Sequence, residues 1–440
     1  MSRIASLIGR RVWDSRGVPT VEAQITLEDG TLARAISPSG ASRGTREAIE
    51  CRDGGTRIGG KDVTRACANL NGPIAKALTG IDTTDQAAID DALLALDQTA
   101  LKEKLGGNAI VAASLASLHA GAAAQRKPLW RHIADLYGTG PSLPLPEIQI
   151  FGGGAHAGRR VDVQDFMVMV PGASSFEEVM AITREVYFAA GDIMARKGRI
   201  AGIADEGGWW PIFDSNEEAL ETLTSAIELA GETPGENVVI SLDIAASEFR
   251  QNDGYRLALE ERSLSSEALI DLLGDWISTY KIASIEDPLA EDDREGMIEF
   301  TRRFGERVQI IGDDYLVTNP KLTADAVRDG AANAVLIKVN QIGTVSEAVR
   351  CFKLARDAGF GTVISARSGE TEDVSISHLA VGLGGGQLKV GSFQRSERMV
   401  KWNECLRIQD ELGAAAFVGG KPLRATWWAK RDQTRTVGQL

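Results

Sequence analysis

The strongest constraint on the fold of this chain is a repeated alternation of short apolar stretches with helical stretches after about residue 142. A strand that is buried on both faces reads as a continuous apolar run, and helical periodicity between such runs indicates crossover connections. The number of units favours a (β/α)8 barrel, and an open doubly wound sheet is the alternative. The runs lie at residues 166–170, 238–242, 282–285, 308–311, 334–337, 361–364 and 387–390.

The first part of the chain has a different pattern of apolar and polar residues. Residues 21–27 alternate between apolar and polar side chains and are followed by a turn at 28–30, which predicts a hairpin. An Ala- and Leu-rich helix is predicted over 108–125, between an N-capping asparagine and a proline. The sequence therefore predicts an N-terminal α+β capping domain at 1–138 and a barrel domain at 142–440.

Charge and cysteine content exclude several classes of protein. The formal net charge of −13 argues against nucleic-acid binding, which needs a basic surface. The first residues lack an apolar signal region, and no run of about 18 apolar residues occurs, so we expect no membrane partner. The cysteines have no CxxC spacing and are too few for a disulfide scaffold. We therefore expect reduced thiols at Cys51, Cys67, Cys351 and Cys405 in a cytoplasmic protein.

Three predicted strands end in a carboxylate. Asp243, Glu286 and Asp313 each close an apolar run. The carboxyl ends of barrel strands meet at one mouth, where the acids would repel one another unless a cation lay between them. Oxygen ligands of this kind suit Mg²⁺. The alternative is that each acid caps the helix that follows it.

Two later strands end in a lysine, at Lys338 and Lys389. Residues that close apolar runs are poor candidates for solvated surface lysines. A lysine beside a cation and a second lysine should have a lowered pKa, as a general base requires. A metal with a base is what proton abstraction next to a carboxylate needs, because the metal neutralises the developing charge.

Nearly the whole chain resembles the enolase family. The motifs that carry the resemblance occur in the family order: WDSRGVPTVE, PSGASRG, DEGG at 205–208, SIEDPLAEDD, LIKVNQIGT, RSGETED and RSER. The resemblance implies an enolase-type (β/α)8 barrel with an N-terminal α+β cap. It also implies lyase-type enolate chemistry on a small phosphorylated or phosphonate carboxylate, and a homodimer or larger homo-oligomer.

The resemblance also implies roles for individual residues. Two Mg²⁺ ions are expected, one structural and one catalytic, with Mn²⁺ as an alternative metal. The implied structural ligands are Asp243, Glu286 and Asp313, the implied catalytic-metal ligand is Ser42, the implied base is Lys338 and the implied acid is Glu206. The implied substrate contacts are Lys389 for the carboxylate, Arg367 and Ser368 for the phosphoryl group, and Gln164 and His156 in segments that line the site. His119, His132 and His378 are expected to be structural.

Departures from the family pattern gather around the predicted leaving group. Ala366 stands where the family has a histidine, and Asp165 replaces a glutamate. The loop before His156 has lost two asparagines, and residues 209–213 read Trp-Trp-Pro-Ile-Phe. A shift of about 1 Å at a reacting group can cost about 10²-fold in rate. We infer that the enolate chemistry is retained while the substrate has changed, with Asp165 as a catalytic and Ala366 as a substrate-lining residue.

Three hypotheses follow. The first is an enzyme that forms an enolpyruvyl product from a 2-phosphoglycerate- or phosphoenolpyruvate-like substrate in phosphonate antibiotic biosynthesis, similar to carboxyphosphonoenolpyruvate synthase. The second is an ordinary phosphopyruvate hydratase. The third is a non-catalytic binding protein with the same fold, against which the clustered acids and lysines argue.

Overall fold

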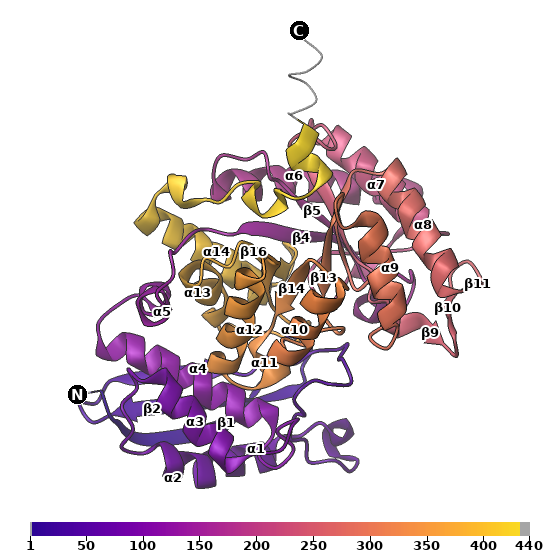
Figure 1. Cartoon of the computed structure of the whole chain (residues 1–440). Coiled ribbons are helices and arrows are strands. Elements are labelled where there is room, and N and C mark those ends of the chain that lie inside the picture. The colour runs from indigo at the N-terminus through magenta and orange to yellow at the C-terminus, as the bar shows by residue number, and fades with distance from the viewer. Residues whose placement is uncertain (1, 432–440) are drawn as a thin grey trace.

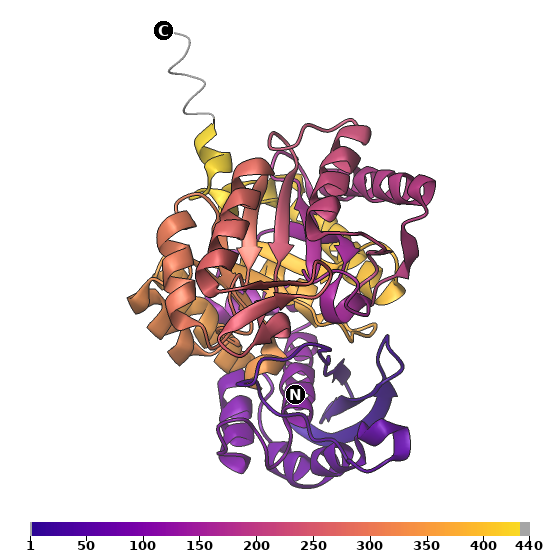
Figure 2. The same cartoon turned by 90° about the vertical axis from the view of Figure 1, so that its right-hand side faces the viewer.

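The structure, a computed structural model, describes residues 2–431. The N-terminal part of the chain forms a unit that lies against one side of a larger barrel, as two perpendicular views show (Figures 1 and 2). The chain passes from the first unit to the barrel after α5 (Leu129–Tyr137) and enters the barrel at β4 (Leu145–Gly152). The predicted linker, residues 138–141, lies in this connection.

The N-terminal unit is a three-stranded antiparallel sheet covered by helices. Its strands lie in the order β1-β2-β3, and α4 packs against β2 and β3. The predicted hairpin corresponds to β2 and β3, whereas β1 was not predicted. The elements are β1 (Ile4–Trp13), β2 (Pro19–Leu27), β3 (Leu32–Ile36), α1 (Thr64–Asn69), α2 (Ala75–Leu78), α3 (Gln86–Leu96) and α4 (Gly107–Ala124).

Helix α4 is long and apolar enough, by length and composition, to cross a membrane. However, 83% of it is buried inside the protein, between the sheet of the first unit and the barrel. A buried core helix of a globular protein has the same composition, so α4 is weak evidence for a membrane partner.

The barrel has eight strands and closes on itself where β16 pairs with β4. This confirms the predicted (β/α)8 barrel with an N-terminal cap. Outer helices follow most of the strands, and the hairpin β6–β7 extends the sheet beyond β4. The barrel strands are β4, β5 (Asp165–Met169), β8 (Val239–Asp243), β12 (Ile282–Glu286), β13 (Gln309–Gly312), β14 (Ala334–Ile337), β15 (Gly361–Ser365) and β16 (Gln387–Gly391).

One strand of the barrel runs against the others. Strand β5 is antiparallel to both of its neighbours, β4 and β8, whereas the sequence pattern predicted parallel strands throughout. The reason is the connection between β4 and β5, residues 153–164, which contains only the short helix η3 (Gly154–Ala157). Parallel strands are usually joined through a crossover helix, and this connection contains only a four-residue helix, so it returns the chain antiparallel.

The helices around the barrel begin at capping residues that the sequence supplies directly. The side chains of Ser175, Ser215, Ser265, Asp293 and Asn319 each accept a hydrogen bond from the first turn of a helix. The helices are α6 (Phe176–Lys197), α7 (Asn216–Leu229), α8 (Ser266–Thr279), α9 (Arg294–Phe304), α10 (Pro320–Asp329), α11 (Val339–Ile342), α12 (Val345–Asp357), α13 (Ser375–Gly382) and α14 (Ser396–Leu412). The remaining short strands are β6 (Ile200–Ile203), β7 (Trp209–Pro211), β9 (Arg250–Gln251), β10 (Gly254–Leu257) and β11 (Arg262–Leu264).

Candidate active site

The three predicted carboxylates lie side by side at the carboxyl ends of neighbouring strands. Asp243 is the last residue of β8 and is paired in register with Glu286, the last residue of β12. Asp313 directly follows β13. None of the three caps a helix, because α8, α9 and α10 are capped by Ser265, Asp293 and Asn319. The capping alternative is therefore wrong, and the acids converge on the barrel mouth.

Two lysines reach into this group of acids. Lys338 Nζ lies 2.5 Å from Asp313 Oδ2, and Lys389 Nζ lies 2.8 Å from both Asp243 Oδ2 and Glu286 Oε2. Burial alone would lower the pKa of each lysine, but the adjacent carboxylates outweigh it and raise both values. The expected lowering depends on a cation between the acids, and the carboxylates alone shift both pKa values upward.

The donor set fits a divalent cation. Glu286 Oε1 and Gln164 Oε1 are buried without a hydrogen-bond partner in the described structure. Buried carboxylate and amide oxygens that lack donors have lone pairs available for a metal, and Mg²⁺ prefers such oxygen ligands. Asp313 carries a second oxygen, Oδ1, that accepts a hydrogen bond from Gln341. Together these residues fit a Mg²⁺ site between the ends of β8, β12 and β13.

A second acidic group lies beside the first. Asp287, Asp313 and Asp314 bring their oxygens within 4.8 Å of one another. Asp287, however, accepts hydrogen bonds from the backbone N–H groups of Asp313 and Asp314, at 2.9 and 2.7 Å. Burial and the neighbouring acids raise the pKa of Asp287 and of Asp314 well above the usual range. Asp287 therefore holds the turn after β13 in place.

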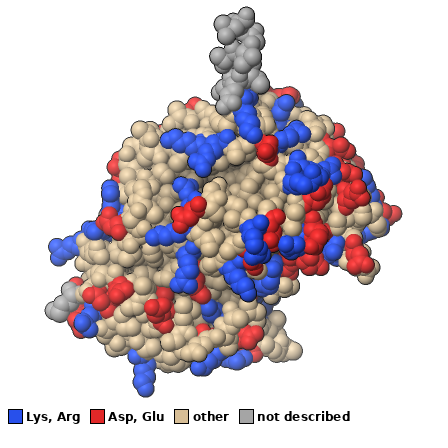
Figure 3. Space-filling view, in the orientation of Figure 1, with Lys and Arg blue, Asp and Glu red and all other residues tan. Residues whose placement is uncertain are grey.

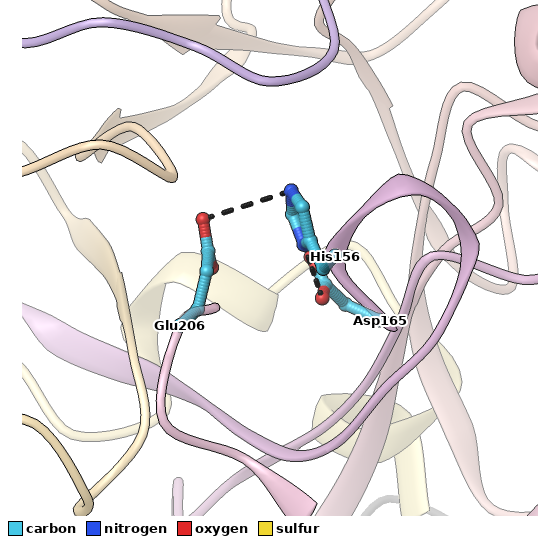
Figure 4. Close-up of side chains that lie close together, drawn as sticks. All are labelled: His156, Asp165 and Glu206. Carbon is cyan, nitrogen blue, oxygen red and sulfur yellow. Dashed lines mark hydrogen bonds and ion pairs between the residues drawn. The ribbon is translucent and has the colours of Figure 1, made fainter. Parts of the chain in front are cut away.

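His156 lies between the side chains of Asp165 and Glu206 (Figure 4), and Asp165 is the β5 neighbour of Asp243. Its Nδ1 is 3.2 Å from Asp165 Oδ1, and its Nε2 is 3.9 Å from Glu206 Oε1. Burial opposes the charged imidazolium, but Glu206 and Asp165 outweigh it and raise the pKa of His156 to about 9. The pKa of Asp165 is held below its usual range, mainly by His156 and then by Lys389. At neutral pH His156 is therefore protonated, with the side chains of Asp165 and Glu206 on either side of it.

Gln149 positions Asp165 and was not predicted as a site residue. Its Nε2 donates a short hydrogen bond to Asp165 Oδ1, and its Oε1 accepts one from Gly208 N at 2.9 Å. Gln149 thereby connects the carboxylate on β5 to the 205–208 segment that carries Glu206. The sequence signal was available: Glu147 and Gln149 occupy alternate positions in the otherwise apolar strand β4, so both side chains point into the barrel.

The predicted phosphoryl contacts hold the 38–44 loop against the barrel. Arg367 donates to Ser42 O at 3.0 Å and forms a two-point ion pair with Glu47, at 2.9 and 3.2 Å. Ser368 Oγ accepts hydrogen bonds from Ala41 N and from Arg16. Sequence reasoning missed Glu47, which is buried within the motif-bearing loop and offered no strand-end signal.

The space enclosed by these residues is small. The cavity measures about 20 Å³ and is lined by Ser42, Glu206, Lys338, Ala366 and Lys389, among others. That is room for about one water molecule. A substrate with a carboxylate and a phosphoryl group therefore requires the 38–44 loop to move away from Arg367. Ala366 forms part of the wall and leaves it open where a larger side chain would project.

The other histidines lie outside this cavity. His119 Nε2 is 2.7 Å from Ser375 Oγ, His378 pairs with Glu404 at 3.2 Å, and His132 is buried near Gly121. Burial lowers the pKa of His119 and of His132, so both are neutral near pH 7.

Comparison with protein-family models gives two matches that together span most of the chain. The model described as "Enolase, N-terminal domain" matches residues 4–133, and the model described as "Enolase, C-terminal TIM barrel domain" matches residues 141–426. The two matches follow the division between the three-stranded unit and the barrel.

Proposed function

The chain belongs to the enolase family, and we propose that it forms an enolpyruvyl product from a 2-phosphoglycerate- or phosphoenolpyruvate-like substrate in phosphonate biosynthesis, in the manner of carboxyphosphonoenolpyruvate synthase. That class of enzyme builds an enolpyruvyl unit that bears a carboxyphosphonate in place of phosphate. Membership of the family makes the protein a lyase-type enzyme, and the family typically uses Mg²⁺. The substrate is the proposed part.

The observation that carries the proposal is a complete set of acids and lysines beside residues that depart from the family pattern. Lys338 and Lys389 pair with Asp313, Asp243 and Glu286, the groups that enolate chemistry requires. Ala366 follows β15, which lies between the strands of the two lysines, and Asp165 pairs in register with Asp243. Changes at Ala366 and Asp165 can alter what the cavity binds while the acids and lysines are kept.

Each residue then has a chemical task. When bound, Mg²⁺ supplies positive charge that stabilises the enediolate formed next to the carboxylate. With a cation bound by the acids, which would favour the neutral amine, Lys338 takes the proton from the carbon beside the carboxylate, and Lys389 binds the carboxylate itself. Glu206 donates a proton to the leaving group, supported by His156 at 3.9 Å. Arg367 and Ser368 bind the phosphoryl or phosphonyl oxygens once the loop releases them.

The decisive experiment follows the ultraviolet absorbance of phosphoenolpyruvate after 2-phosphoglycerate and Mg²⁺ are added to the protein. We expect no turnover with this substrate, and turnover with a carboxyphosphonate donor that Lys338→Ala abolishes. Turnover of 2-phosphoglycerate with a kcat of about 1–10³ s⁻¹, lost in Lys338→Ala, would overturn the proposal in favour of an ordinary hydratase.

The ordinary phosphopyruvate hydratase is the second candidate because the carboxylate and lysine set is complete. The substitution Ala366→His distinguishes between these two candidate functions. If the open wall admits a larger substrate group, the histidine should reduce turnover of the carboxyphosphonate donor at least tenfold, since it fills space that the ligand needs. An unchanged rate would show that this wall does not contact the substrate.

A further inference from the structure

A second cavity lies at the end of the barrel opposite the active site. It measures about 450 Å³ and is bordered by the residues with which several strands begin. Gln309 and Gly361 are the first residues of β13 and β15, and Asn333 and Gly386 immediately precede β14 and β16. Asp313 and Lys338 follow the other ends of β13 and β14, so this cavity is separate from the active site. Its volume lies in the range of small-molecule sites.

The walls of this cavity carry positive charge without compensating negative charge. Arg356, at the end of α12, and Lys421 and Arg424, in the C-terminal segment, line it, and no aspartate or glutamate does so. The neutral polar side chains of the wall are hydrogen-bonded within the protein. Asn333 donates to Gly305 O and Val308 O, and Thr362 donates to Gly385 O.

The three cations, in contrast, have no carboxylate partner among residues 2–431. The closest interaction recorded for Arg356 is with the ring of Phe352, whose centroid is 6.0 Å away. Lys and Arg side chains gather on the upper part of the face shown in Figure 3, near the C-terminal segment that Figure 1 draws in yellow.

Arg356 and Pro422 both lie close to Gly386 in the wall of the cavity. A methyl group placed on Gly386 would lie 3.9 Å from Arg356 Nη1 and 3.9 Å from Pro422 Cγ. The side chain from α12 and the segment 421–424 therefore meet above this glycine. Phe360 and Pro422 add apolar surface to the same cavity. The cavity thus offers donors for an anion and an apolar wall for an organic group.

We propose that this cavity binds a small organic phosphate, with Arg356, Lys421 and Arg424 on the phosphate and Phe360 and Pro422 against the organic part. Guanidinium groups match the geometry of phosphate oxygens and bind them through paired N–H groups. The proposal does not depend on the substrate of the active site, which lies at the far end of the barrel.

Calorimetric titration of the intact, Mg²⁺-loaded protein with AMP, inorganic phosphate and adenosine tests the proposal. We expect AMP to bind more tightly than either inorganic phosphate or adenosine. The double variant Arg356→Ala/Arg424→Ala should weaken AMP binding at least tenfold and leave enzymatic turnover unchanged. Arg350→Ala, an exposed arginine on the same helix, is the matched control and should bind AMP as the original protein does.

A second variant tests whether AMP binds in this cavity or in the active site, which also has groups suited to phosphate. Arg367→Ala should retain AMP binding at the base of the barrel. Loss of AMP binding in Arg367→Ala, equal binding in the double variant, or no binding of AMP at millimolar concentration would each overturn the proposal. Arg424→Lys, which keeps the charge, should retain more affinity than Arg424→Glu. Circular dichroism checks that all variants are folded.

Discussion

Glu47 compensates the positive charge of Arg367 inside the protein. Both side chains are almost fully buried, and Glu47 also accepts a hydrogen bond from Gly44 N. The pKa of Arg367 is raised because Glu47, followed by Asp313, outweighs the effect of burial. A buried cation that loses its partner keeps the cost of its desolvation, which is why single-partner deletions are strongly destabilising.

We therefore expect Glu47→Gln to lower the free energy of unfolding by about 3 kcal/mol, as measured by urea denaturation monitored by circular dichroism. Glu299→Gln is the matched control, because Glu299 pairs with Arg302 at 2.6 Å on the exposed surface. The control should change the free energy by less than about 1 kcal/mol. Equal effects of the two substitutions would mean that Arg367 is solvated in the folded protein.

At the scale of elements, the 38–44 loop is held closed by backbone contacts. Ser39 and Gly369 exchange two backbone hydrogen bonds, and Gly40 lies directly against the guanidinium of Arg367. A methyl group at residue 40 would overlap that guanidinium, so the closed loop seen here could not form. We expect the loop to close again after the substrate has entered, because it carries Ser42 to the cavity.

Gly40→Ala should consequently reduce kcat/KM about 10²-fold, the size of effect seen when reacting groups are misplaced by about 1 Å. Thermal denaturation should be nearly unchanged, because the loop is at the surface of the barrel mouth. Gly72→Ala is a suitable control, since a methyl group there meets no atom within 4 Å. Unimpaired kinetics in Gly40→Ala would show that the loop reaches a catalytic position other than the one described.

The junction between the cap and the barrel contains a buried acid. Asp90 on α3 accepts hydrogen bonds from Ser114 on α4 and from Ser346 N in the first turn of α12. Burial raises the pKa of Asp90 from 3.8 to about 6. Because the unfolded chain ionises this group first, its contribution to stability falls as the pH rises from about 4 to about 6, and it stays low above that range.

Asp90→Asn removes this titration. Relative to the original protein, the variant should gain about 1.4 kcal/mol in free energy of unfolding between pH 5 and pH 8, from the difference between the two pKa values. Urea denaturation at both pH values provides the measurement. The exposed neighbour Asp91→Asn should show no such gain. A gain of the same size in both variants would assign the effect to net charge and not to the junction.

The barrel strands that were predicted from sequence are those with continuous apolar runs between helices. The structure confirms β14 at residues 334–337 and places β8, β12 and β13 within one residue of the predicted starts. Strand β4 was not predicted because Glu147 and Gln149 interrupt its apolar run, although both are buried. The predicted orientation of β5 was wrong because the direction of a strand depends on how the chain returns to the sheet, and the composition of the strand does not encode that path.

The candidate site shows the same difference between residues that a sequence pattern predicts and residues that only the fold brings together. Strand-end acids and lysines are visible in sequence because a charged residue that closes an apolar run is conspicuous. Their partners Glu47, Gln149 and Asn340 come from a loop, a strand interior and a short helix, and only the folded chain brings them to Arg367 and Asp165. The proposed basic cavity at the base of the barrel was likewise not predicted, because Arg356 is 65 residues from Lys421 and 68 residues from Arg424 in sequence.

For the molecule as a whole, stability depends on how the charge at the barrel mouth is balanced. Asp243, Glu286 and Asp313 come from three neighbouring strands, and their neutralisation by Lys338 and Lys389 is shared with Asp165. A ligand that binds only the folded protein stabilises it in proportion to the logarithm of its concentration over Kd. Because these acids come together only when the barrel closes, a divalent cation bound there must favour the closed barrel over the unfolded chain.

Mg²⁺ should therefore raise the free energy of unfolding by about 2.7 kcal/mol at 100 times its Kd, and EDTA should reverse the effect. The measurement is the thermal midpoint as a function of Mg²⁺ concentration, in the original protein and in Asp243→Asn. Asp253→Asn, on a surface turn remote from the strand ends, is the control and should retain the full response. If Asp243→Asn responded to Mg²⁺ as the original protein does, the cation would bind elsewhere, and the strand-end acids would serve only as partners for the two lysines. If the response to Mg²⁺ is lost in Asp243→Asn but kept in the control, Mg²⁺ binds at the strand-end acids, and its binding is coupled to closure of the entire barrel.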